Sequence, residues 1–90
     1  MLKPSYRNEF KKELKQQEKR GKNLQTFLSV AKKLINEEPL EAKFRNHKLS
    51  GNFKDRWECH LEPDWLLIYF LTNEEIIFER TGTHSDLFKK

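Results

Sequence analysis

Residues 56–71 of this 90-residue chain read RWECHLEPDWLLIYFL, and this stretch decides the fold. Apolar and polar residues alternate from Trp57 to Leu61, which is the period of a β-strand with one buried face. Pro63-Asp64 is typical of a tight turn. The run Trp65–Leu71 is apolar throughout, which predicts a central strand covered on both faces. The stretch therefore predicts a β-hairpin whose second strand lies inside a sheet.

Further strands are expected on both sides of this hairpin. Downstream, Ile76–Arg80 has strand character, the Thr81-Gly82-Thr83 sequence is expected to break it, and Ser85–Phe88 forms a short closing segment. Upstream, Leu2–Tyr6 resembles a short first strand, and its Pro4 restricts it to a sheet edge or a strand start.

Two helices are expected between the first strand and residue 40. The first begins at Ser5 or Asn8, either of which can cap it, and Gly21 ends it. The second runs roughly over 24–36, where apolar residues recur at three- and four-residue spacing. The linker of three residues between them predicts an antiparallel helical hairpin.

These elements predict one α+β domain over residues 1–90. Two antiparallel N-terminal helices should pack on one face of a three- to four-stranded, mainly antiparallel sheet. Residues 40–53 show no sustained period and contain a turn signal at Ser50-Gly51-Asn52. They are predicted to form a basic loop, and such a loop beside a rigid scaffold suits phosphate contacts, Lys48 included.

Charge is unevenly distributed along the chain. Net charge is +4, but residues 1–35 hold ten Lys or Arg against three Glu, and residues 36–90 carry an acidic excess. A basic surface indicates a polyanionic partner, while a solvated helix face is the simpler reading. The N-terminus lacks the apolar core of a signal peptide, no run is long enough to span a bilayer, and the one cysteine cannot form an internal disulfide. A cytoplasmic protein is expected.

Metal and thiol chemistry are not expected. The three histidines are 13 and 24 residues apart, far from the close pairs of zinc sites. Cys59 should point to the face of its strand opposite His60, toward the core. We therefore expect neither a metal nor another cofactor.

Acid–base chemistry is the stronger candidate. Folding at Pro63 should bring Asp64 and Trp65 back beside His60, where a carboxylate can orient the imidazole and set its tautomer. Trp65 is either core or a platform on which a base stacks.

Other residues fit a phosphate-ester substrate. Arg80, at a strand end, is either a surface salt bridge or a planar donor for a scissile phosphate, and Arg56 is a second candidate phosphate contact. Phe88 is either an RNA contact or a plug for the core. Two proton-transfer groups, a phosphate clamp and aromatic surface are the parts for RNA cleavage by the ribose 2′-OH, which needs no metal.

Three phrases carry a family likeness. Residues 47–51 (HKLSG), 56–69 (RWECHLEPDWLLIY) and 78–88 (FERTGTHSDLF) resemble the YafQ branch of the RelE/ParE toxin superfamily. The resemblance covers roughly residues 39–88 and implies a RelE-like fold. The helical half matches mainly in pattern and length.

The resemblance implies a bacterial type II toxin that cleaves mRNA in the A site of the 70S ribosome and so inhibits translation. It implies a DinJ-like antitoxin in a toxin–antitoxin hetero-oligomer, and contact with operator DNA indirectly, through the antitoxin. The functional residues of the family fall on six positions of this chain: His47, His60, Asp64, Trp65, His84 and Phe88. Arg80 also matches an arginine placed near the phosphate in the wider family.

Roles can be assigned within that expectation. His60 with Asp64 is expected to handle one proton, His84 the other, and His47 to position the phosphate, with acid and base left open between them. Lys11, Lys12 and Lys15 are the candidates for docking on ribosomal RNA, a polyanion.

Two rivals remain open. ParE-type relatives of the same fold poison DNA gyrase and lack the histidine set. A non-catalytic RNA- or protein-binding module would keep the histidines as structural residues only, and substituting His84 by Ala would leave its effects largely intact.

Overall fold

The computed structural model describes residues 1–51 and 55–88 of the chain. Along the sequence the elements are β1 (Lys3–Tyr6), α1 (Asn8–Lys19), α2 (Leu24–Ile35), η1, a single 3-10 turn (Ala42–Phe44), β2 (His47–Lys48), β3 (Arg56–Glu62), β4 (Trp65–Leu71), β5 (Glu75–Gly82) and α3 (His84–Leu87). None of the helices in these ranges is long and apolar enough to cross a bilayer.

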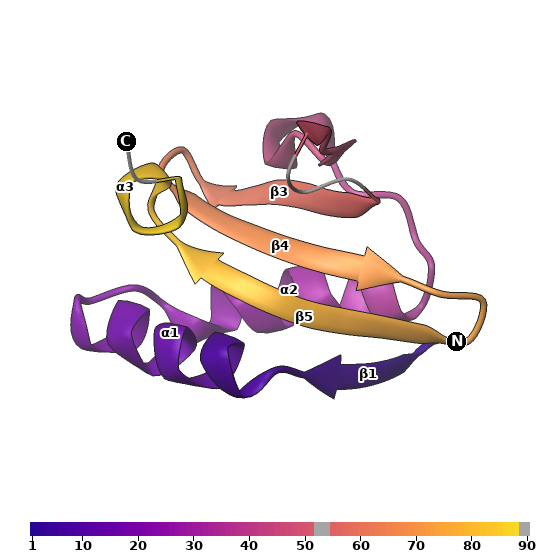
Figure 1. Cartoon of the computed structure of the whole chain (residues 1–90), viewed down its shortest axis with the longest axis horizontal. Coiled ribbons are helices and arrows are strands. Elements are labelled where there is room, and N and C mark those ends of the chain that lie inside the picture. The colour runs from indigo at the N-terminus through magenta and orange to yellow at the C-terminus, as the bar shows by residue number, and fades with distance from the viewer. Residues whose placement is uncertain (52–54, 89–90) are drawn as a thin grey trace.

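The sheet has five strands, in the order β1-β5-β4-β3-β2 (Figure 1). β1 is parallel to β5, and the other neighbouring pairs are antiparallel. The expectation of three or four strands was therefore too low. The unexpected strand is β2, inside the segment predicted to be a loop, because a strand of two residues is too short to show a period.

The hairpin of β3 and β4 lies in the sheet as its sequence predicts. β4 pairs with β3 on one side and β5 on the other, and its first five residues are buried. Tyr69, Cys59 and Phe78 face the main core, while Leu66 and Ile68 face a smaller apolar cluster on the opposite side of the sheet. Coverage on both faces explains the unbroken apolar run of β4.

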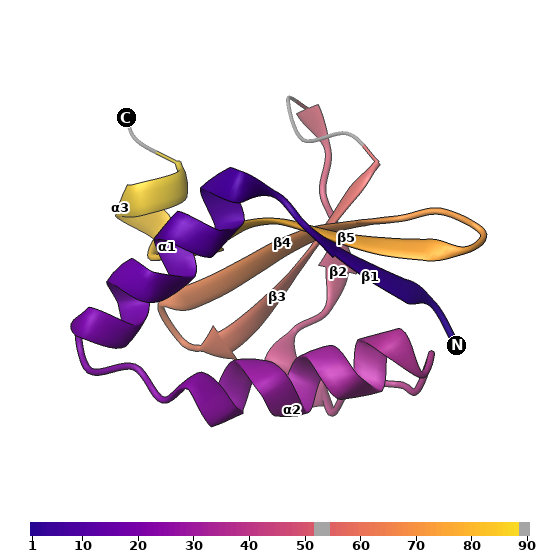
Figure 2. The same ribbon diagram turned by 90° about the horizontal axis from the view of Figure 1, so that it is seen from below.

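The two N-terminal helices do not occupy one face as expected. α2 crosses one face of the sheet, whereas α1 lies along the edge of β5 beyond the end of β1 (Figures 1 and 2). β1 pairs with β5 only as far as Phe78, and beyond it the Thr81 amide donates to the Glu13 carboxylate of α1 at 3.1 Å. The short β1 thus leaves an edge that α1 covers, while Phe10 still reaches the same core as α2.

Helix ends agree with the sequence only in part. Gly21, with φ of +97°, follows α1, and the Lys22 amide donates back to the Gln17 carbonyl at 3.1 Å, as in a Schellman motif. The start of α1 differs from expectation: Arg7 is the N-cap and makes no side-chain capping bond, so neither Ser5 nor Asn8 caps the helix.

The C-terminal quarter also differs. β5 continues through Thr81 and Gly82, where a break was expected, because Thr81 is buried and pairs with Leu67. The closing segment is the short helix α3. Of the predicted turn at residues 50–52, Gly51 has a φ of +68°, and Asn52 lies outside the described residues.

Candidate active site

Three imidazoles lie in a row on the side of the sheet opposite α2. The ring centroids of His47 and His60 are 6.3 Å apart, and those of His60 and His84 are 5.7 Å apart. His47 comes from β2, His60 from β3 and His84 from the first position of α3. Strand pairing and the C-terminal turn therefore unite side chains that the sequence separates.

A buried carboxylate, Glu58, joins the first two rings. Its Oε1 atom lies 3.3 Å from His47 Nε2 and 3.4 Å from His60 Nε2, and its side chain is only 7% exposed. The sequence pattern alone assigned Glu58 no role in the site. The signal was the i, i+2 spacing, which puts both side chains on one face of β3.

The other ring nitrogens of these histidines face backbone carbonyls. His47 Nδ1 lies 2.6 Å from the Arg45 oxygen, and His60 Nδ1 lies 3.3 Å from the Pro63 oxygen. A carbonyl only accepts hydrogen bonds, so Nδ1 of each ring carries the proton. Nε2 of each ring then faces the Glu58 carboxylate, and it can form a hydrogen bond to that carboxylate only if it carries a proton as well. The Glu58 carboxylate therefore lies within reach of Nε2 of both rings.

The second carboxylate, Asp64, is bonded to His84 rather than to His60, which corrects the pairing expected from the sequence. Asp64 Oδ1 accepts from His84 Nδ1 at 2.6 Å and from the His84 amide at 2.9 Å. These two hydrogen bonds lower the pKa of Asp64. Because Nδ1 of His84 is occupied, Nε2 is the nitrogen left for proton exchange with a substrate.

The C-terminal turn holds His84 in place. Thr83 and Asp86 form a capping box around the start of α3, and Asp86 also accepts from Arg20 of α1 at 2.7 Å. Hydrogen bonds from Arg20 and from the Thr83 amide lower the pKa of Asp86 to about 2. Gly82 is required here, because a Cβ on it would lie 2.8 Å from the Asp86 Cβ.

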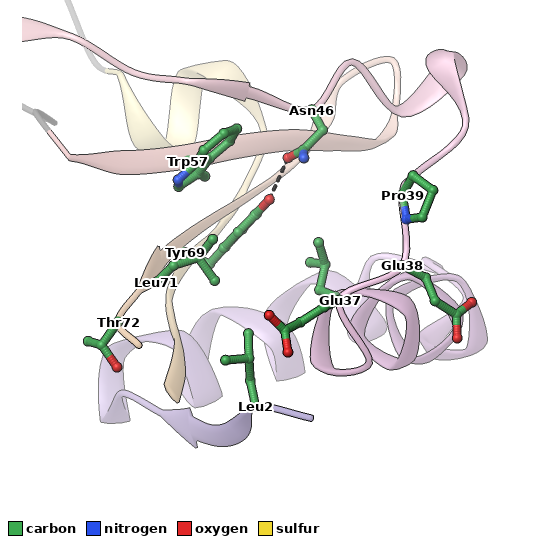
Figure 3. Close-up of a pocket in the computed structure, with 10 residues that line it drawn as sticks. Leu2, Glu37, Glu38, Pro39, Asn46, Trp57, Tyr69, Leu71 and Thr72 are labelled. Carbon is green, nitrogen blue, oxygen red and sulfur yellow. Dashed lines mark hydrogen bonds between the residues drawn. The ribbon is translucent and has the colours of Figure 1, made fainter. Parts of the chain in front are cut away.

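His47 is positioned from the core. The Tyr69 hydroxyl donates to the Asn46 Oδ1 atom, immediately before His47, and Figure 3 shows the Tyr69 side chain reaching up to Asn46. Tyr69 is buried, and burial raises the pKa of its hydroxyl. The cavity in Figure 3, of about 350 Å³, is lined by Leu2 and Leu34 of the main core, on the sheet face that α2 covers.

Two predicted site residues are engaged elsewhere. Trp65 is 1% exposed and its indole N–H donates to the Thr81 hydroxyl at 2.9 Å, so it is a core residue and no platform for a base. Arg80 forms an ion pair with Glu13 at 2.7 Å and approaches Glu9 at 3.6 Å. The hydrogen bonds to Glu13 raise the pKa of the guanidinium, and no contact among the described residues joins Arg80 to the histidines.

The remaining predicted contacts are spread over both faces. Lys48 lies with its amine 6.0 Å from the Trp57 ring centroid, on the face of β3 opposite His60. Arg56 shares the face of His60 but pairs with Glu79 at 2.8 Å. Phe88 packs against the small cluster of Leu66 and Ile68, beside α3. The lysines expected to dock on the ribosome are exposed along α1: Lys11, Lys12 and Lys15.

The structure gives no support for a metal site or for a reactive thiol among the residues that it describes. Within residues 1–51 and 55–88, no group of three or more His, Cys, Asp or Glu side chains is placed to hold a metal ion. Cys59 is completely buried, and burial raises the pKa of its thiol to about 12. The thiol is therefore protonated at neutral pH and inert.

Comparison with known proteins gives consistent matches over nearly the whole chain. Residues 2–89 match the family model described as a bacterial toxin of type II toxin–antitoxin systems, YafQ. The chain is 42% identical to the mRNA interferase toxin YafQ of Escherichia coli K12, with 92% of this chain and 91% of that protein covered. It is 32% identical to a putative YafQ toxin of Haemophilus influenzae, with 93% and 89% covered.

A solved structure supports the same relationship. The fold superimposes on a chain in the crystal structure of the E. coli DinJ–YafQ complex with a TM-score of 0.91, at 39% identity, covering 98% of this chain and 99% of that one.

Proposed function

This chain belongs to the YafQ family of toxins of bacterial type II toxin–antitoxin systems, and on that premise we propose that it is an endoribonuclease that cleaves mRNA in the ribosomal A site. The observation that carries the proposal is the row of three imidazoles, with the Glu58 carboxylate between the first two rings and the Asp64 carboxylate on the third. The mRNA interferase activity in the name of the E. coli relative supports it.

The proposed reaction uses the nucleophile that RNA itself supplies. The ribose 2′-OH loses its proton while its oxygen bonds to the adjacent phosphorus, and the bond from phosphorus to the 5′-oxygen breaks. The leaving 5′-oxygen takes up a proton. The products are a 2′,3′-cyclic phosphate and a 5′-OH end, and each proton transfer needs a group that can exchange protons near neutral pH.

We assign one proton transfer to the pair of Asp64 and His84. Its 2.6 Å hydrogen bond fixes the ring and leaves Nε2 to exchange a proton with RNA. The other transfer belongs to His47 and His60 with Glu58, whose shared contacts of 3.3 and 3.4 Å are long enough to be replaced when substrate binds. A phosphate above His60 would lie between the two groups.

The first test is primer extension on a defined mRNA in a purified translation system. Wild-type protein should produce a ribosome-dependent cut, and His84→Ala should slow it by about 10²- to 10⁴-fold, the usual contribution of a proton-transfer group. Ser85→Ala, one residue away and exposed, is the matched control and should cut normally.

A 2′-deoxy sugar at the cut position should abolish cleavage. Failure of DNA supercoiling with intact translation would point instead to gyrase poisoning.

A modified leaving group separates acid from base. In a substrate with sulfur in place of the bridging 5′-oxygen, the leaving group is a thiolate, which departs without being protonated. This substrate should therefore restore the cleavage rate of the variant that lacks the general acid. We expect rescue of either His84→Ala or the His47→Ala and His60→Ala pair, but not of both sets. Rescue of neither would remove the general acid from this cluster.

We further propose an antitoxin partner of the DinJ type, because the matching E. coli chain was solved in a DinJ–YafQ complex. The antitoxin should form a hetero-oligomer with this chain, inhibit it, and carry the complex to operator DNA. Co-expression of the neighbouring open reading frame, followed by affinity purification on a tag carried by the toxin, tests this. Recovery of the toxin alone, or undiminished cutting by the purified pair, would reject it.

A further inference from the structure

A second cavity opens beside the histidine row, at the outer edge of β3. It has a volume of about 480 Å³ and lies between η1, the β3–β4 turn and Thr26 of α2. β2 pairs with β3 only at Trp57 and Glu58, so no described strand covers the same edge at His60 and Leu61.

The walls of this cavity combine apolar side chains with cationic ones. Phe44 and Leu61 supply apolar surface, and Lys43 and Arg45 supply two exposed cations at the rim. The Lys43 amine lies 5.2 Å from the centroid of the Phe44 ring. An aromatic wall beside two cations matches a nucleotide, which has a flat apolar base and an anionic phosphate.

The cavity is physically continuous with the histidines. Of the three histidines, His60 lines the cavity, which reaches around the edge of β3 from the α2 side, and His60 also stands at the centre of the imidazole row. Arg45 lines the cavity too, and its carbonyl oxygen receives the His47 Nδ1 hydrogen bond at 2.6 Å. Arg45 adopts a φ of +47°, a conformation that costs a non-glycine residue free energy and persists where the surroundings enforce it.

We propose that this cavity binds the nucleobase of a nucleotide that adjoins the scissile phosphate, and that Phe44 is the residue that senses the base. The proposal rests on the ribonuclease function proposed above and adds a specificity site to it. Phe44 forms the aromatic wall, and Lys43 and Arg45 contact the flanking phosphates. The volume lies within the range of small-molecule sites. His60, which lines the cavity, links the proposed base site to the imidazole row.

The test compares cleavage maps, obtained by sequencing the new 5′ ends from a pool of mRNAs in the purified translation system. Wild-type protein should show a base preference at one position next to the cut. Phe44→Leu keeps apolar volume but removes the aromatic face, and it should flatten that preference by about tenfold or more. Tyr6→Leu, an exposed aromatic on β1, is the matched control and should leave the map unchanged.

A second variant and a binding measurement make the result decisive. Lys43→Ala removes one exposed cation from the cavity without touching the backbone that holds His47, and it should raise KM, whereas Lys3→Ala on β1 should leave KM unchanged. Nucleoside 3′-monophosphates titrated into the ribosome-free protein should shift the NMR signals of Phe44 and Thr26, and Phe44→Leu should weaken that binding.

The outcomes separate the two proposals. Cleavage with an unaltered base preference in Phe44→Leu overturns the specificity site and leaves the ribonuclease in place. Nucleotide-induced shifts confined to His84 and Asp64 overturn it as well. Binding at Phe44 by a wild-type protein that cuts no RNA would instead overturn the ribonuclease and keep a nucleotide cavity.

Discussion

At the scale of single residues, the sharpest claim is that Asp64 acts through His84. Asp64→Asn keeps the size of the side chain but removes the charge that holds the His84 ring with Nδ1 protonated. We expect cleavage to fall by about tenfold or more, up to the 10²- to 10⁴-fold loss of a proton-transfer group, with the fold unchanged. The measurement is the single-turnover rate on ribosomes, with Glu74→Gln, an exposed acid in the β4–β5 turn, as control.

The pH profile extends this prediction. Because the His84 hydrogen bonds lower the pKa of Asp64, its carboxylate stays ionised, and the pair stays intact, to a lower pH than a free aspartate would allow. Loss of activity with acid in the wild-type protein should therefore not follow protonation of Asp64 near its ordinary pKa. An acid limb that disappears in Asp64→Asn would contradict this.

Cys59 gives a prediction of inertness. Its thiol is fully buried and its pKa is raised to about 12, so iodoacetamide should not label the folded protein at pH 8. Labelling should appear only with denaturant, at the same midpoint as the loss of circular dichroism. Rapid labelling of the folded chain would show that the β3–β4 core opens locally.

The sequence indicated which residues matter better than how they pair. Alternation placed Cys59 inward and His60 outward, and both placements are confirmed. The pairing of Asp64 with His84 could not be predicted, because it depends on where the C-terminal turn returns to the β3–β4 turn. Trp65 shows a different limit of sequence analysis. A tryptophan suits both a core and a surface on which a base stacks, and only its burial in the structure shows that Trp65 is a core residue.

At the scale of elements, the join between α1 and the C-terminal turn is held by Asp86. Its carboxylate receives hydrogen bonds from Arg20 and Gln17 of α1 and from the Thr83 amide. The folded-state pKa of about 2 lies below the ordinary value of 3.8, so the stabilisation is present above pH 4 and is lost as pH falls toward 2. Because the side chain is 28% exposed, we expect roughly 1–2 kcal/mol.

Denaturant titrations between pH 2 and 7 measure this contribution. Asp86→Asn should be less stable than wild type at pH 7, and the two proteins should converge near pH 2. A constant difference across that range would mean that the ionised carboxylate contributes nothing, and that the loss comes from packing alone.

Gly82→Ala tests the same join sterically. The new Cβ would approach the Asp86 Cβ to 2.8 Å, so the capping box must shift and carry His84 with it. Overpacking of this kind typically costs about 1–3 kcal/mol. We expect a lower melting temperature. We also expect a lower cleavage rate at a temperature where the variant is fully folded, so that unfolding does not account for the loss. Unchanged cleavage in a stable variant would show that the turn does not position His84.

Elements with a clear period were predictable, and those without one were not. The α2 pattern and the β3–β4 hairpin each rest on six or more residues in register with a period. β2 and α3 have two and four residues, too few to show a period, and the segment of β2 is held by contacts distant in sequence, such as the Tyr69 bond to Asn46. Both short elements carry a histidine to which we assign a catalytic role, so the least predictable segments are the ones that build the proposed site.

At the scale of the whole molecule, α1 is placed by a mismatch in strand length that the sequence does not show. β5 has eight residues and its parallel partner β1 has four, and α1 covers the edge that remains. Glu13 of α1 binds both the Thr81 amide and the Arg80 side chain there. The basic side of α1, with Lys11, Lys12 and Lys15, is exposed, so the surface that we propose to dock on the ribosome lies on the same helix that supports the C-terminal turn.

Charge reversal of those three lysines tests the role of this surface. Lys11→Glu, Lys12→Glu and Lys15→Glu together should weaken ribosome binding, because each cation that meets a phosphate releases counterions from the RNA. The slope of log K against log salt should fall by about 2 to 3 in magnitude if all three contact phosphates. The measurement is ribosome co-sedimentation over a series of salt concentrations.

The control decides whether position or net charge is responsible. Reversal of Lys3, Lys32 and Lys33 changes net charge equally but alters β1 and α2, so it should reduce binding less and leave most of the slope. Equal losses in the two triple variants would mean that the protein meets the ribosome through its overall field alone. Unchanged binding of the α1 variant at physiological salt would place the contact elsewhere, and the exposed cations Lys43 and Arg45 beside the histidines would then be the next surface to reverse.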